Sequence, residues 1–526
     1  EPFSAKNKII ITNGCMAGTG VSSSGRLSVG GKSPLTGGAK ESNAGGTLGD
    51  TLAKLGLRAI IIEERNPNET EKLIMVIDSE GNIQFDQAEA ILGKGNFESA
   101  ETLFAQYGKD NALLILGPAA EQRLYSAAIA VTDLYNRPSR MAARGGLAAV
   151  LADKGIKAIV VSKKGKKQQP GMNAEAFKAA RKNFNDTVRD SDRVKVLREY
   201  GTSSTYMPMH ILGAVPTRNF REGVFEKGEE ICGEALHDLI DERGGVGCNS
   251  EACMAGCQVK CSNVFPDAAG KEIVAPLEYE TLVLMGSNLG IGDLDQIGQF
   301  NWLANDLGVD TIELGGTLGV MAEAGLVEFG DYEGFEKIIK GIYEKTMEGR
   351  IAGMGAYRAA ELLGVRRAPV VKKQTMSAYD PRAIKGTGVT YATSPMGADH
   401  TAGLTIFFPG DHSDKVDEVM FSQRAQIQRA GYDCIGLCCF LTSAFGMNPA
   451  AVTDVIAKLY NIDFTPENWN ELAKATLRKE VEFNRAAGLG KETDTIPEFF
   501  KTEKLIPSGA IWDIADSEMD VDLLFA

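Results

Sequence analysis

Three cysteines lie close together near the middle of this chain, with three residues between neighbours, and they constrain its fold more than any other feature. They are Cys253, Cys257 and Cys261, in the segment SEACMAGCQVKC. A fourth candidate, Cys438, lies far downstream in YDCIGLCCF. Three clustered thiolates and one distant thiolate are typical of a closed four-thiolate iron–sulfur site. The pattern therefore predicts a cofactor, redox chemistry and a contact between two distant parts of the chain.

The spacing leaves other interpretations of the three cysteines open. Positions i, i+4 and i+8 share one face of a helix, so three buried thiols in a helical core would give the same pattern. A structural zinc site usually has paired CxxC ligands, and this sequence contains no CxxC. Radical S-adenosylmethionine enzymes use three cysteines with a shorter second gap. Among these alternatives the spacing favours an iron–sulfur cluster.

Composition excludes some classes of protein. The 526 residues carry a formal net charge of −14, which argues against nucleic acid as a partner because phosphate backbones demand basic surfaces. Nine cysteines in a long chain indicate metal or redox chemistry rather than a disulfide framework. No apolar run approaches the roughly 20 residues of a membrane span. The chain opens at EPFSAKNKIIITNG without Met or a signal peptide, so we expect a cytoplasmic protein that is processed or incomplete.

The chain divides into a β-rich first part and a mainly helical remainder. Short apolar runs rich in β-branched residues predict buried strands at 8–12, 58–64, 73–78, 112–117 and 157–162. Amphipathic patterns predict helices at 173–200, 292–308, 316–326, 333–348, 354–363 and from about 413 onwards. Basic breaks at 163–171 and 366–374 are the expected boundaries. We therefore expect a multidomain α+β fold with a β-rich domain 1–165 and two mainly helical domains, 166–370 and 371–526.

Two segments far apart in the sequence resemble each other. Asn305–Asp310 (NDLGVD) and Asp433–Cys438 (DCIGLC) each begin with a polar side chain, continue with Gly and an aliphatic residue, and end in Asp or Cys. Either one alone predicts only a helix end with Gly at the C′ position. Taken together, with one of them containing the fourth cysteine, they suggest a shared ligand role, since carboxylates and amides can bind the NH-rich edge of a pterin.

Gly-rich turns after the predicted strands carry arginines. Arg26 precedes one such turn, Asn43 and Gly45 form another in NAGG, and Arg144 with Gly145 forms a third in RGG. Arg is a natural bidentate partner for phosphate, and Gly lets backbone N–H groups approach it. These turns suggest a polyanionic cofactor on the surface of a sheet. There is no GxGxxG or Walker A motif, so neither NAD nor ATP is indicated.

Two further residues could carry chemistry only with support from elsewhere. His400 lies in SPMGADHTAG, and Glu280 precedes the apolar run LVLMG. A glutamate in such a place is usually a solvated surface group, and such a histidine is usually structural. The sequence pattern alone favours those ordinary roles.

Seven motifs, taken in order, resemble one known family. They are GRLSVGGKSPLTGGAKESNAGG, ARGGLAAV, LEYETL, LGVDTIELGG, YDPR, GADH and DCIGLC. Over nearly its whole length the chain resembles the tungsten-dependent aldehyde:ferredoxin oxidoreductase family, to which the KSPLTG…SNAGG and DxxGLC elements are specific. The resemblance implies a β-rich pterin-binding base domain, two helical domains, and oxidation of an aldehyde to a carboxylic acid.

The resemblance also implies cofactors and the residues that hold them. One tungsten, or molybdenum, would be held by the dithiolenes of two pterins, beside one [4Fe–4S] cluster and a magnesium that bridges the pterin phosphates. By position, the phosphates and magnesium would be held by Arg26, Asn43, Gly45, Arg144 and Gly145; the pterins would be contacted by Asn305, Asp310, Asp433 and Leu437; and the cluster would be bound by Cys253, Cys257, Cys261 and Cys438.

Three residues are implied on the substrate side of the metal: Glu280, Tyr379 and His400. Glu280 is the candidate base that accepts a proton as the substrate is oxidised. Tyr379 and His400 are candidates to donate hydrogen bonds to the carbonyl oxygen. Water would supply the oxygen, and two electrons would leave through the cluster one at a time.

The sequence departs from the family's pattern in four ways. The first cysteine gap is one residue longer than is common, so Cys248 competes with Cys253 as first cluster ligand. Asn305 gives the first pterin motif an uncharged start. Gln296 and Gln299 stand where the family binds an iron between subunits, so an iron-bridged dimer is not expected, although an oligomer is. The resemblance implies about 50 residues before the first strand, whose strands would complete the pterin base sheet, so we expect a fragment or a partner that supplies them.

Two other functions and the electron partner stay open at this point. A low-potential reductase of the same superfamily, like the aromatic acyl-CoA reductases, would share the cofactors, but its substrate would need a long channel and basic residues for its phosphates. A cofactor-free structural subunit would be expected to lack the cysteines, Glu280 and His400. Ferredoxins are commonly acidic, as this chain is, so charge steering would be poor. We therefore expect a dedicated iron–sulfur subunit as the alternative to ferredoxin.

Overall fold

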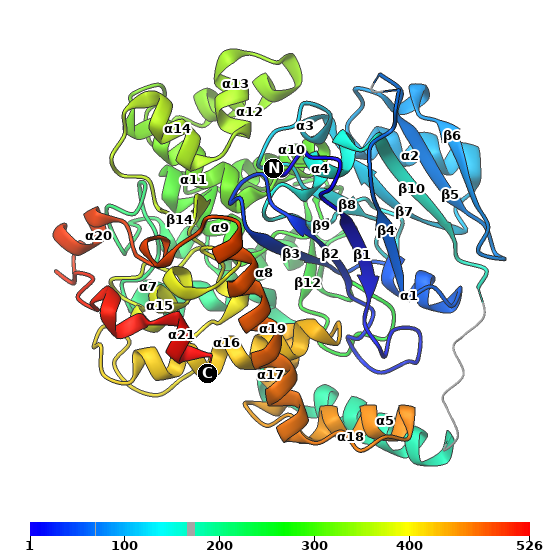
Figure 1. Cartoon of the computed structure of the whole chain (residues 1–526). Helices are drawn as coiled ribbons and strands as arrows, with labels where there is room; N and C mark the ends of the chain where they lie inside the picture. The colour runs from blue at the N-terminus through cyan, green and yellow to red at the C-terminus, as the bar shows by residue number, and fades with distance from the viewer. Residues whose placement is uncertain (69, 166–173, 526) are drawn as a thin grey trace.

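Two β-sheets form the first third of the protein (Figure 1). The structure, a computed structural model, describes residues 1–68, 70–165 and 174–525. The strands of this region are β1 (Ile9–Asn13), β2 (Leu27–Lys32), β3 (Ala39–Ala44), β4 (Ala59–Ile62), β5 (Leu73–Ile77), β6 (Ile83–Gln87), β7 (Asn111–Leu116), β8 (Ile129–Val131), β9 (Arg140–Ala142) and β10 (Ile156–Ser162). The five predicted strands are confirmed as β1, β4, β5, β7 and β10.

The two sheets differ in strand order. The first is antiparallel throughout, in the order β3-β2-β1-β4, with Ile11 opposite Val29 in β2. The second has the order β6-β5-β10-β7-β8-β9, in which only β5 and β10 run parallel. Helices α1 (Leu48–Lys54) and α4 (Leu147–Asp153) contact strands of both sheets and join them.

Strand β7 shows why these runs form buried strands. Successive side chains of a strand point to opposite faces. Leu114 and Leu116 of β7 therefore belong to the core that the two sheets share, while Leu113 and Ile115 pack on the other face. Helix α2 (Asn96–Tyr107) covers that second face. Because both faces are covered, the strand is apolar without alternation.

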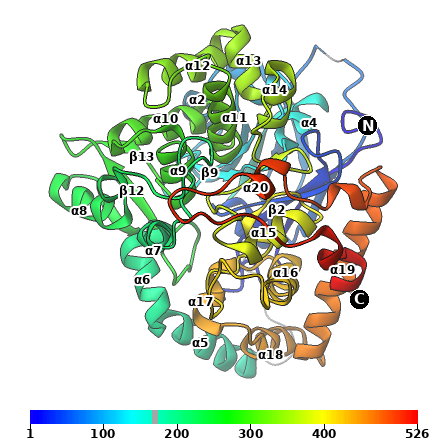
Figure 2. The same cartoon turned by 90° about the vertical axis from the view of Figure 1, so that its left-hand side faces the viewer.

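The remainder of the chain is mainly helical, as expected (Figures 1 and 2). Its helices are α5 (Ala174–Asp190), α6 (Asp192–Tyr200), α7 (Tyr206–Ile211), α8 (Gly233–Arg243), α9 (Tyr279–Leu284), α10 (Leu294–Leu307), α11 (Thr311–Glu323), α12 (Tyr332–Glu344), α13 (Met347–Gly353), α14 (Ala356–Leu363), α15 (Lys385–Thr393), α16 (Glu418–Cys434), α17 (Thr442–Phe445), α18 (Ala450–Tyr460), α19 (Pro466–Ala486), α20 (Glu498–Thr502) and α21 (Val521–Leu524), with α3 (Pro118–Glu121) earlier. The strands here are β11 (Cys248–Glu251), β12 (Ser262–Pro266), β13 (Glu272–Val274), β14 (Val370–Val371) and β15 (Gln374–Thr375).

The structure describes the two predicted domain boundaries to different extents. Most of the break at 163–171, and the first residue of the helical stretch 173–200, lie outside the described residues. The described part of that stretch forms two helices, because the chain turns at Ser191 between α5 and α6. Residues 366–374 include β14 and part of β15, and Gln374 is fully buried. The division into domains 1–165, 166–370 and 371–526 stays a prediction.

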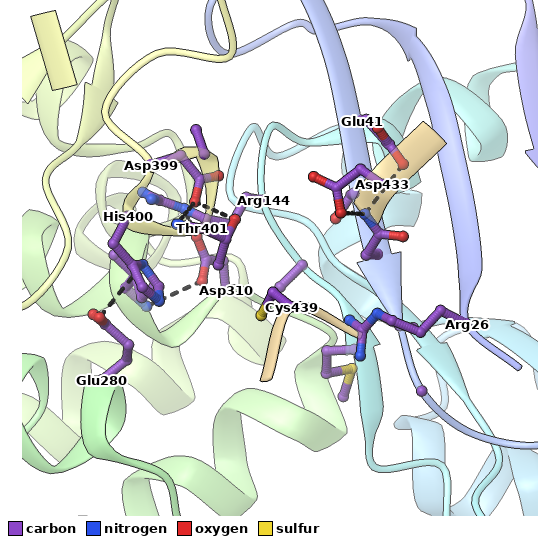
Figure 3. A pocket seen from close by; sticks show the side chains of 18 of the residues that line it. Arg26, Glu41, Arg144, Glu280, Asp310, Asp399, His400, Thr401, Asp433 and Cys439 are labelled. Atoms are coloured by element: carbon purple, nitrogen blue, oxygen red, sulfur yellow. Dashed lines mark hydrogen bonds and ion pairs between the residues drawn. The ribbon is translucent and has the colours of Figure 1, made fainter. Parts of the chain in front are cut away.

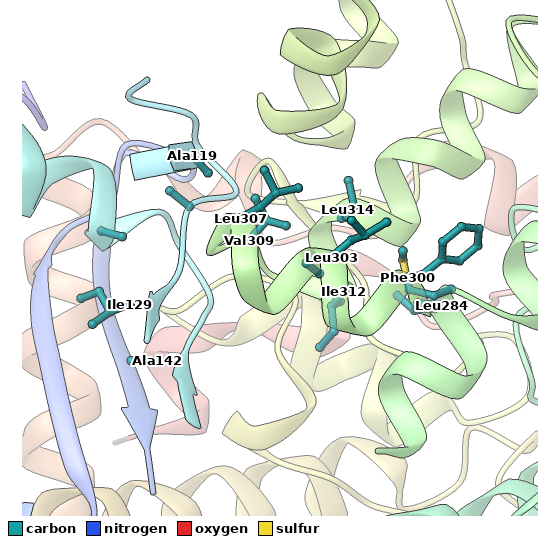
Figure 4. Close-up of a cluster of buried hydrophobic side chains, with 14 of the residues drawn as sticks. Ala119, Ile129, Ala142, Leu284, Phe300, Leu303, Leu307, Val309, Ile312 and Leu314 are labelled. Atoms are coloured by element: carbon teal, nitrogen blue, oxygen red, sulfur yellow. The ribbon is translucent and has the colours of Figure 1, made fainter. Parts of the chain in front are cut away.

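One hydrophobic core joins the sheets to the helices (Figure 4). Ile129 of β8 and Ala142 of β9 belong to the same cluster as Leu307 and Val309 at the end of α10. This shared core fixes the end of α10 against the sheet strands, so the turn that follows the helix has a defined position. No helix in the described ranges is long and apolar enough to cross a membrane.

Candidate cofactor and active site

A cavity of about 400 Å³ lies where the sheets meet the helices (Figure 3). Its walls come from the first sheet, the cysteine segment, α9, the end of α10, the turn before His400 and the end of α16. Twelve predicted site residues line it: Arg26, Asn43, Gly45, Arg144, Cys253, Cys261, Glu280, Asn305, Asp310, His400, Asp433 and Cys438. Residues from three distant parts of the sequence therefore surround one space.

Four predicted residues do not line this cavity. Tyr379 lines a second, adjoining cavity. The Leu437 side chain packs in a hydrophobic cluster and is 1% exposed. Gly145 packs behind the wall, where an added Cβ would lie 2.4 Å from the Lys40 side chain. Cys257 is buried beside the wall.

The cysteine segment is not a helix, which excludes the helical stripe of thiols. It connects strand β11 to strand β12, and Gly256 and Lys260 within it have positive φ values of 72° and 53°. Such values interrupt a right-handed helix. Cys248 lies at the start of β11, opposite Val264, and does not line the cavity, whereas Cys253 does.

Contacts from the first sheet hold the cysteine segment in place. Gly45, directly after β3, lies so close to Cys253 that an added Cβ would be 3.0 Å from Cys253 Sγ. The next backbone N–H, of Gly46, donates to the Cys253 carbonyl at 2.9 Å. The Ser23 hydroxyl donates to Cys257 Sγ at 3.4 Å, and the Ser23 backbone carbonyl accepts from the Cys438 N–H at 3.0 Å. One serine thus connects the clustered cysteines to the distant one.

Arg26 lies at the cysteine end of the cavity, which Arg140 also lines (Figure 3). Burial lowers the pKa of the Arg26 guanidinium, but the negative charges that Cys438, Cys253 and Cys439 carry as thiolates outweigh burial and raise it. Its side chain has no hydrogen-bond or ion-pair partner among the described residues. An unpaired guanidinium in a cavity fits an anionic ligand, because buried charges are normally paired.

The donor set suits a bulky cofactor better than one bare ion. In the described ranges no group of three or more His, Cys, Asp or Glu side chains is arranged to hold a single metal ion. A four-iron cluster is larger than an ion, and its iron and sulfide atoms keep the four thiolates apart. The thiols of Cys253, Cys261 and Cys438 on one cavity wall fit that larger group.

The two similar segments end their helices in the same way. Gly308 after α10 has φ 70°, and Gly436 after α16 has φ 69°. In the first turn Gly308 N–H donates to Asn305 and Val309 N–H to Ala304. In the second, Gly436 N–H donates to Asp433 and Leu437 N–H to Tyr432. The predicted Gly helix ends are thus confirmed, and the first residue of each segment faces the cavity.

The opposite end of the cavity is a network of buried charges. Arg144 donates from Nε to Asp310 at 3.3 Å and from Nη1 to the Ala398 carbonyl at 2.7 Å. Lys40 Nζ lies 2.9 Å from Asp399. Burial raises the pKa of Asp399, but the cations of Lys40 and Arg144 outweigh it and hold that pKa well below its usual range. Residue 400 follows directly, so this network fixes the backbone that carries His400.

Glu280 and His400 face each other at the edge of the cavity (Figure 3). Glu280 Oε1 lies 3.4 Å from His400 Nδ1 and has no hydrogen-bond partner among the described residues, while Oε2 accepts from the Ala378 N–H at 2.8 Å. Burial raises the pKa of Glu280 to about 8. The Tyr379 ring centroid is 5.7 Å from that of His400, and burial raises the pKa of Tyr379, so its phenol stays protonated.

Ser377 determines which ring nitrogen of His400 carries the proton. Its Oγ accepts from Arg144 Nη1 at 3.1 Å and from the His400 backbone N–H at 3.4 Å, and both of these groups can only donate. The single hydroxyl hydrogen of Ser377 is left for His400 Nδ1, 2.9 Å away. Burial lowers the pKa of His400 to about 4, so the ring is neutral near pH 7 and its one proton lies on Nε2.

A second cavity, of about 920 Å³, adjoins the first. Both cavities are lined by Arg26, Glu280, His400 and Cys438, so these residues stand where they meet. Tyr379 lines the second cavity beside them. A small molecule in the second cavity and a cofactor in the first could therefore both contact Glu280 and His400.

Sequence reasoning missed several residues of the site: Lys40, Ser377, Asp399, Cys439 and Glu480. Asp399 lies inside the GADH motif and Cys439 directly follows Cys438, so both were signalled by their neighbours. Lys40 lies inside the first motif and was signalled in the same way. Ser377 carried no signal, because its role depends on contacts with residues far away in the sequence.

Comparisons with known proteins identify the family of this chain. The family model described as aldehyde ferredoxin oxidoreductase, N-terminal domain, matches residues 1–163, and that described as domains 2 & 3 matches residues 179–520. The tungsten-containing aldehyde ferredoxin oxidoreductase of Pyrococcus horikoshii is 32% identical over 539 residues, which cover 97% of this chain and 85% of that protein. The aliphatic sulfonate oxidoreductase, WOR-like subunit, of Pyrococcus furiosus is 25% identical over 568 residues, covering 99% and 84%.

A solved structure shows the same fold. The active site complex BamBC of benzoyl coenzyme A reductase in complex with 1,5-dienoyl-CoA matches with a TM-score of 0.77 over 100% of this chain and 87% of that chain. Its sequence identity is 19%, so this likeness concerns the fold alone. The two family models together cover most of the sequence. The chain belongs to the aldehyde ferredoxin oxidoreductase family.

Proposed function

We propose that this protein oxidises an aldehyde to a carboxylic acid and passes the electrons to ferredoxin or to an iron–sulfur partner subunit. The observation that carries the proposal is the junction of the two cavities, where Glu280, His400 and Tyr379 stand beside the cysteine end. The reaction balances as aldehyde plus water giving carboxylate, three protons and two electrons. The side chains of this protein would bind the aldehyde and accept a proton, and the electrons would leave through the cysteine end of the cavity.

The first cavity fits a tungsten, or molybdenum, bis-pterin. The resemblance assigns Arg26 and Arg144 to the pterin phosphates and their magnesium. Arg26 has an unpaired guanidinium and is the better supported of the two, because Arg144 already donates to Asp310 and Ala398. Asn305 and Asp433 would meet the NH-rich pterin edges, and the Asn305 side chain has no hydrogen-bond partner among the described residues. Leu437 is proposed to contact the pterin through its backbone, because its side chain is buried elsewhere.

The cysteine end fits one [4Fe–4S] cluster. Its proposed ligands are Cys253, Cys257, Cys261 and Cys438. Cys253 is favoured over Cys248 as the first ligand, because only Cys253 lines the cavity. Arg26 lies between these thiols and Asp433, so it would contact both cofactors. When bound, the tungsten bis-pterin would take up the two electrons from the substrate and pass them to the cluster.

The protein's own groups would handle the proton and the carbonyl. Glu280 Oε1 is free to accept a proton once the carboxyl group is ionised. His400 Nε2–H and the Tyr379 hydroxyl would donate hydrogen bonds to the carbonyl oxygen, where negative charge develops. Because His400 is neutral, it can donate without adding a positive charge beside Glu280.

Aldehyde oxidation is favoured over the alternatives. Four relatives that are 31% or 32% identical are named tungsten-containing aldehyde ferredoxin oxidoreductases, whereas the benzoyl coenzyme A reductase shares the fold at 19% identity. A structural subunit without cofactors would not need an unpaired Arg26 and an unpartnered Glu280 oxygen. Ferredoxin or a dedicated subunit, oligomer formation and a cytoplasmic location stay predictions.

Anaerobic purification followed by elemental analysis tests the proposal. We expect about one tungsten or molybdenum and about four iron per chain, together with aldehyde-dependent reduction of a viologen dye. Protein with both metals that reduces an acyl-CoA thioester but oxidises no aldehyde would contradict the proposed direction. Anaerobic affinity purification that returned this chain alone would count against a dedicated electron-transfer subunit.

A further inference from the structure

The walls of the second cavity are largely apolar along their length. Six of its side chains are Met209, Leu404, Ile406, Phe407, Phe408 and Phe440. They come from α7, from the segment between His400 and α16, and from the turn after Cys438. Helices α6 and α17, which lie in contact, close another side (Figure 2).

The cavity reaches from the catalytic groups to the protein surface. Glu280, Tyr379 and His400 stand at its inner end, where it adjoins the first cavity. Phe407, which is 58% exposed, and Met447, which is 46% exposed, mark its outer part. A phenylalanine that is half exposed and faces a cavity can bury its surface only when that cavity is filled.

The basic side chains of this cavity stand mainly at its inner end. Arg26 and Arg429 are near the cysteines, and Arg429 donates to the Cys439 carbonyl at 2.6 Å. Arg193, exposed on α6, is the other basic residue among the described lining residues, which include no lysine. A coenzyme A group, whose phosphates would lie towards the surface, would meet one cation there. An uncharged body suits these walls better.

We propose that the second cavity is the substrate site, and that it selects aldehydes with an apolar body at least as large as an aromatic ring, which Leu404 and the Phe407–Phe408 segment enclose. This inference rests on the proposed function, because it names the substrate class of that reaction. The aldehyde carbon lies at Glu280 and His400, and the body extends outward between Phe440 and Leu404. The carboxylate that forms lies at the end of the cavity that carries Arg429.

The size of the expected selectivity follows from apolar burial. A cavity of about 920 Å³ is within the range of sites for drug-sized ligands, so a two-carbon aldehyde leaves most of its wall in contact with water. Each methylene that leaves water for such a wall is expected to raise affinity about fourfold. The gain continues until the cavity is filled and then stops.

Two series of compounds test the inference on the anaerobically purified protein. The first consists of unreactive carboxylates from acetate to octanoate, with benzoate, whose binding is measured by calorimetry. The second consists of the matching aldehydes, with kcat/KM measured by viologen reduction. Both series are expected to rise about fourfold per methylene. Benzoyl-CoA is titrated in parallel, and we expect it to bind no more tightly than benzoate.

Two variants of the wall and one control locate the effect. Leu404→Asn keeps the number and branching of side-chain heavy atoms but makes the wall polar, so it should lower octanoate affinity and kcat/KM for octanal about tenfold, and kcat/KM for acetaldehyde by less. Phe407→Ser should act in the same direction, and because this residue is half exposed its loss leaves the core intact. Leu326→Asn, a leucine outside both cavities, should change neither series.

The outcomes separate this inference from the proposed function. Chain-length-dependent carboxylate binding that Leu404→Asn flattens supports the substrate site even if no aldehyde is oxidised. Equal affinity and equal kcat/KM along both series would overturn the site while leaving aldehyde oxidation in place. Binding of benzoyl-CoA more than tenfold tighter than that of benzoate would overturn it in favour of a coenzyme A thioester.

Discussion

The two helix ends at Asn305–Asp310 and Asp433–Cys438 have one backbone design and two chemistries. In both, Gly adopts a left-handed conformation after the helix. In both, the N–H groups of Gly and of the next residue donate to carbonyls of the last helical turn. The sixth residue also has nearly the same conformation, with φ −70° and ψ 119° at Asp310 and φ −68° and ψ 131° at Cys438. Yet Asp310 pairs with Arg144, whereas Cys438 lies among thiols beside Arg26. A local turn can therefore position a ligand without deciding what it binds.

The difference divides the cavity into a carboxylate end and a thiol end. The carboxylate end already has its charges paired within the protein, through Arg144, Lys40 and Asp399. The thiol end has an unpaired Arg26 and several thiols that are protonated unless a metal replaces the proton. We therefore expect the thiol end to depend on its cofactor for order more than the carboxylate end does.

Removing the sixth residue of the second turn should have the largest effect. Cys438→Ala takes away the cluster ligand that joins the two parts of the chain, so iron should fall from about four per chain to near zero, and turnover should be lost. Iron is measured by plasma mass spectrometry after anaerobic purification. Cys248→Ala is the matched control and should keep its iron; iron loss in that variant would make Cys248 the first ligand.

Glu280→Gln should slow the reaction while both ends of the cavity keep their metals. Turnover should fall about 10²-fold or more, because the variant cannot accept a proton. In the parent protein burial raises the pKa of the carboxyl group to about 8, so kcat/KM should rise with pH, reach half its maximum near pH 8 and level off about one pH unit above that. Steady-state rates between pH 6 and 10 measure this. A pH profile that stays unchanged in Glu280→Gln would exclude Glu280 as the base.

Placing the same substitution at the two Gly positions tests how alike the turns are. Both residues have positive φ, so Ala strains each by about 1 kcal/mol. At Gly436 the added Cβ would also lie 2.3 Å from the Gly14 Cα, whereas at Gly308 the nearest atom is a side-chain nitrogen of Asn96 at 3.1 Å. The free energy of unfolding should therefore fall by about 2–4 kcal/mol in Gly436→Ala and by about 1 kcal/mol in Gly308→Ala.

Urea unfolding of the two variants measures that difference. Equal losses of stability would show that the contact between Gly14 and Gly436 relaxes, and that the second turn is held no more tightly than the first.

The smallest expected effect concerns Ser377 at the carboxylate end. Ser377→Ala removes the donor to His400 Nδ1, so the ring can place its proton on either nitrogen. We expect kcat to fall about tenfold with KM nearly unchanged, since the hydrogen bond to the carbonyl matters most in the transition state. Ser377→Thr keeps the hydroxyl and should recover most of the rate. A rise in KM together with a fall in kcat, without recovery by Thr, would indicate a structural role only.

Local patterns could be predicted from the sequence, and distant contacts could not. The apolar runs that became β1 and β7, and the Gly residues that end α10 and α16, follow from rules that act within a few residues. The spacing of the three cysteines suggested a helix face among other possibilities, but positive φ at Gly256 excludes it, and spacing alone does not reveal φ.

The resemblance brought most of the candidate site, and its limits are physical. Motif positions placed Arg26, Arg144 and Asp433 around one cavity, as the structure has them. They did not predict Ser377, whose importance comes from lying between Arg144 and His400, nor the apolar segment around Phe407, which has no helix or strand period. Such residues acquire roles only when three or more chain segments meet.

The contact of Ser23 with both Cys257 and Cys438 has a consequence for biosynthesis. A ribosome that has completed the two sheets has made Arg26 and Ser23, but nothing yet faces them from the far side. That wall appears only when the turn after α16 emerges, after helices α5 to α16 have been made. Closure of the cysteine end around a cofactor must therefore follow synthesis of this turn, and until then the earlier thiols are open to oxidation.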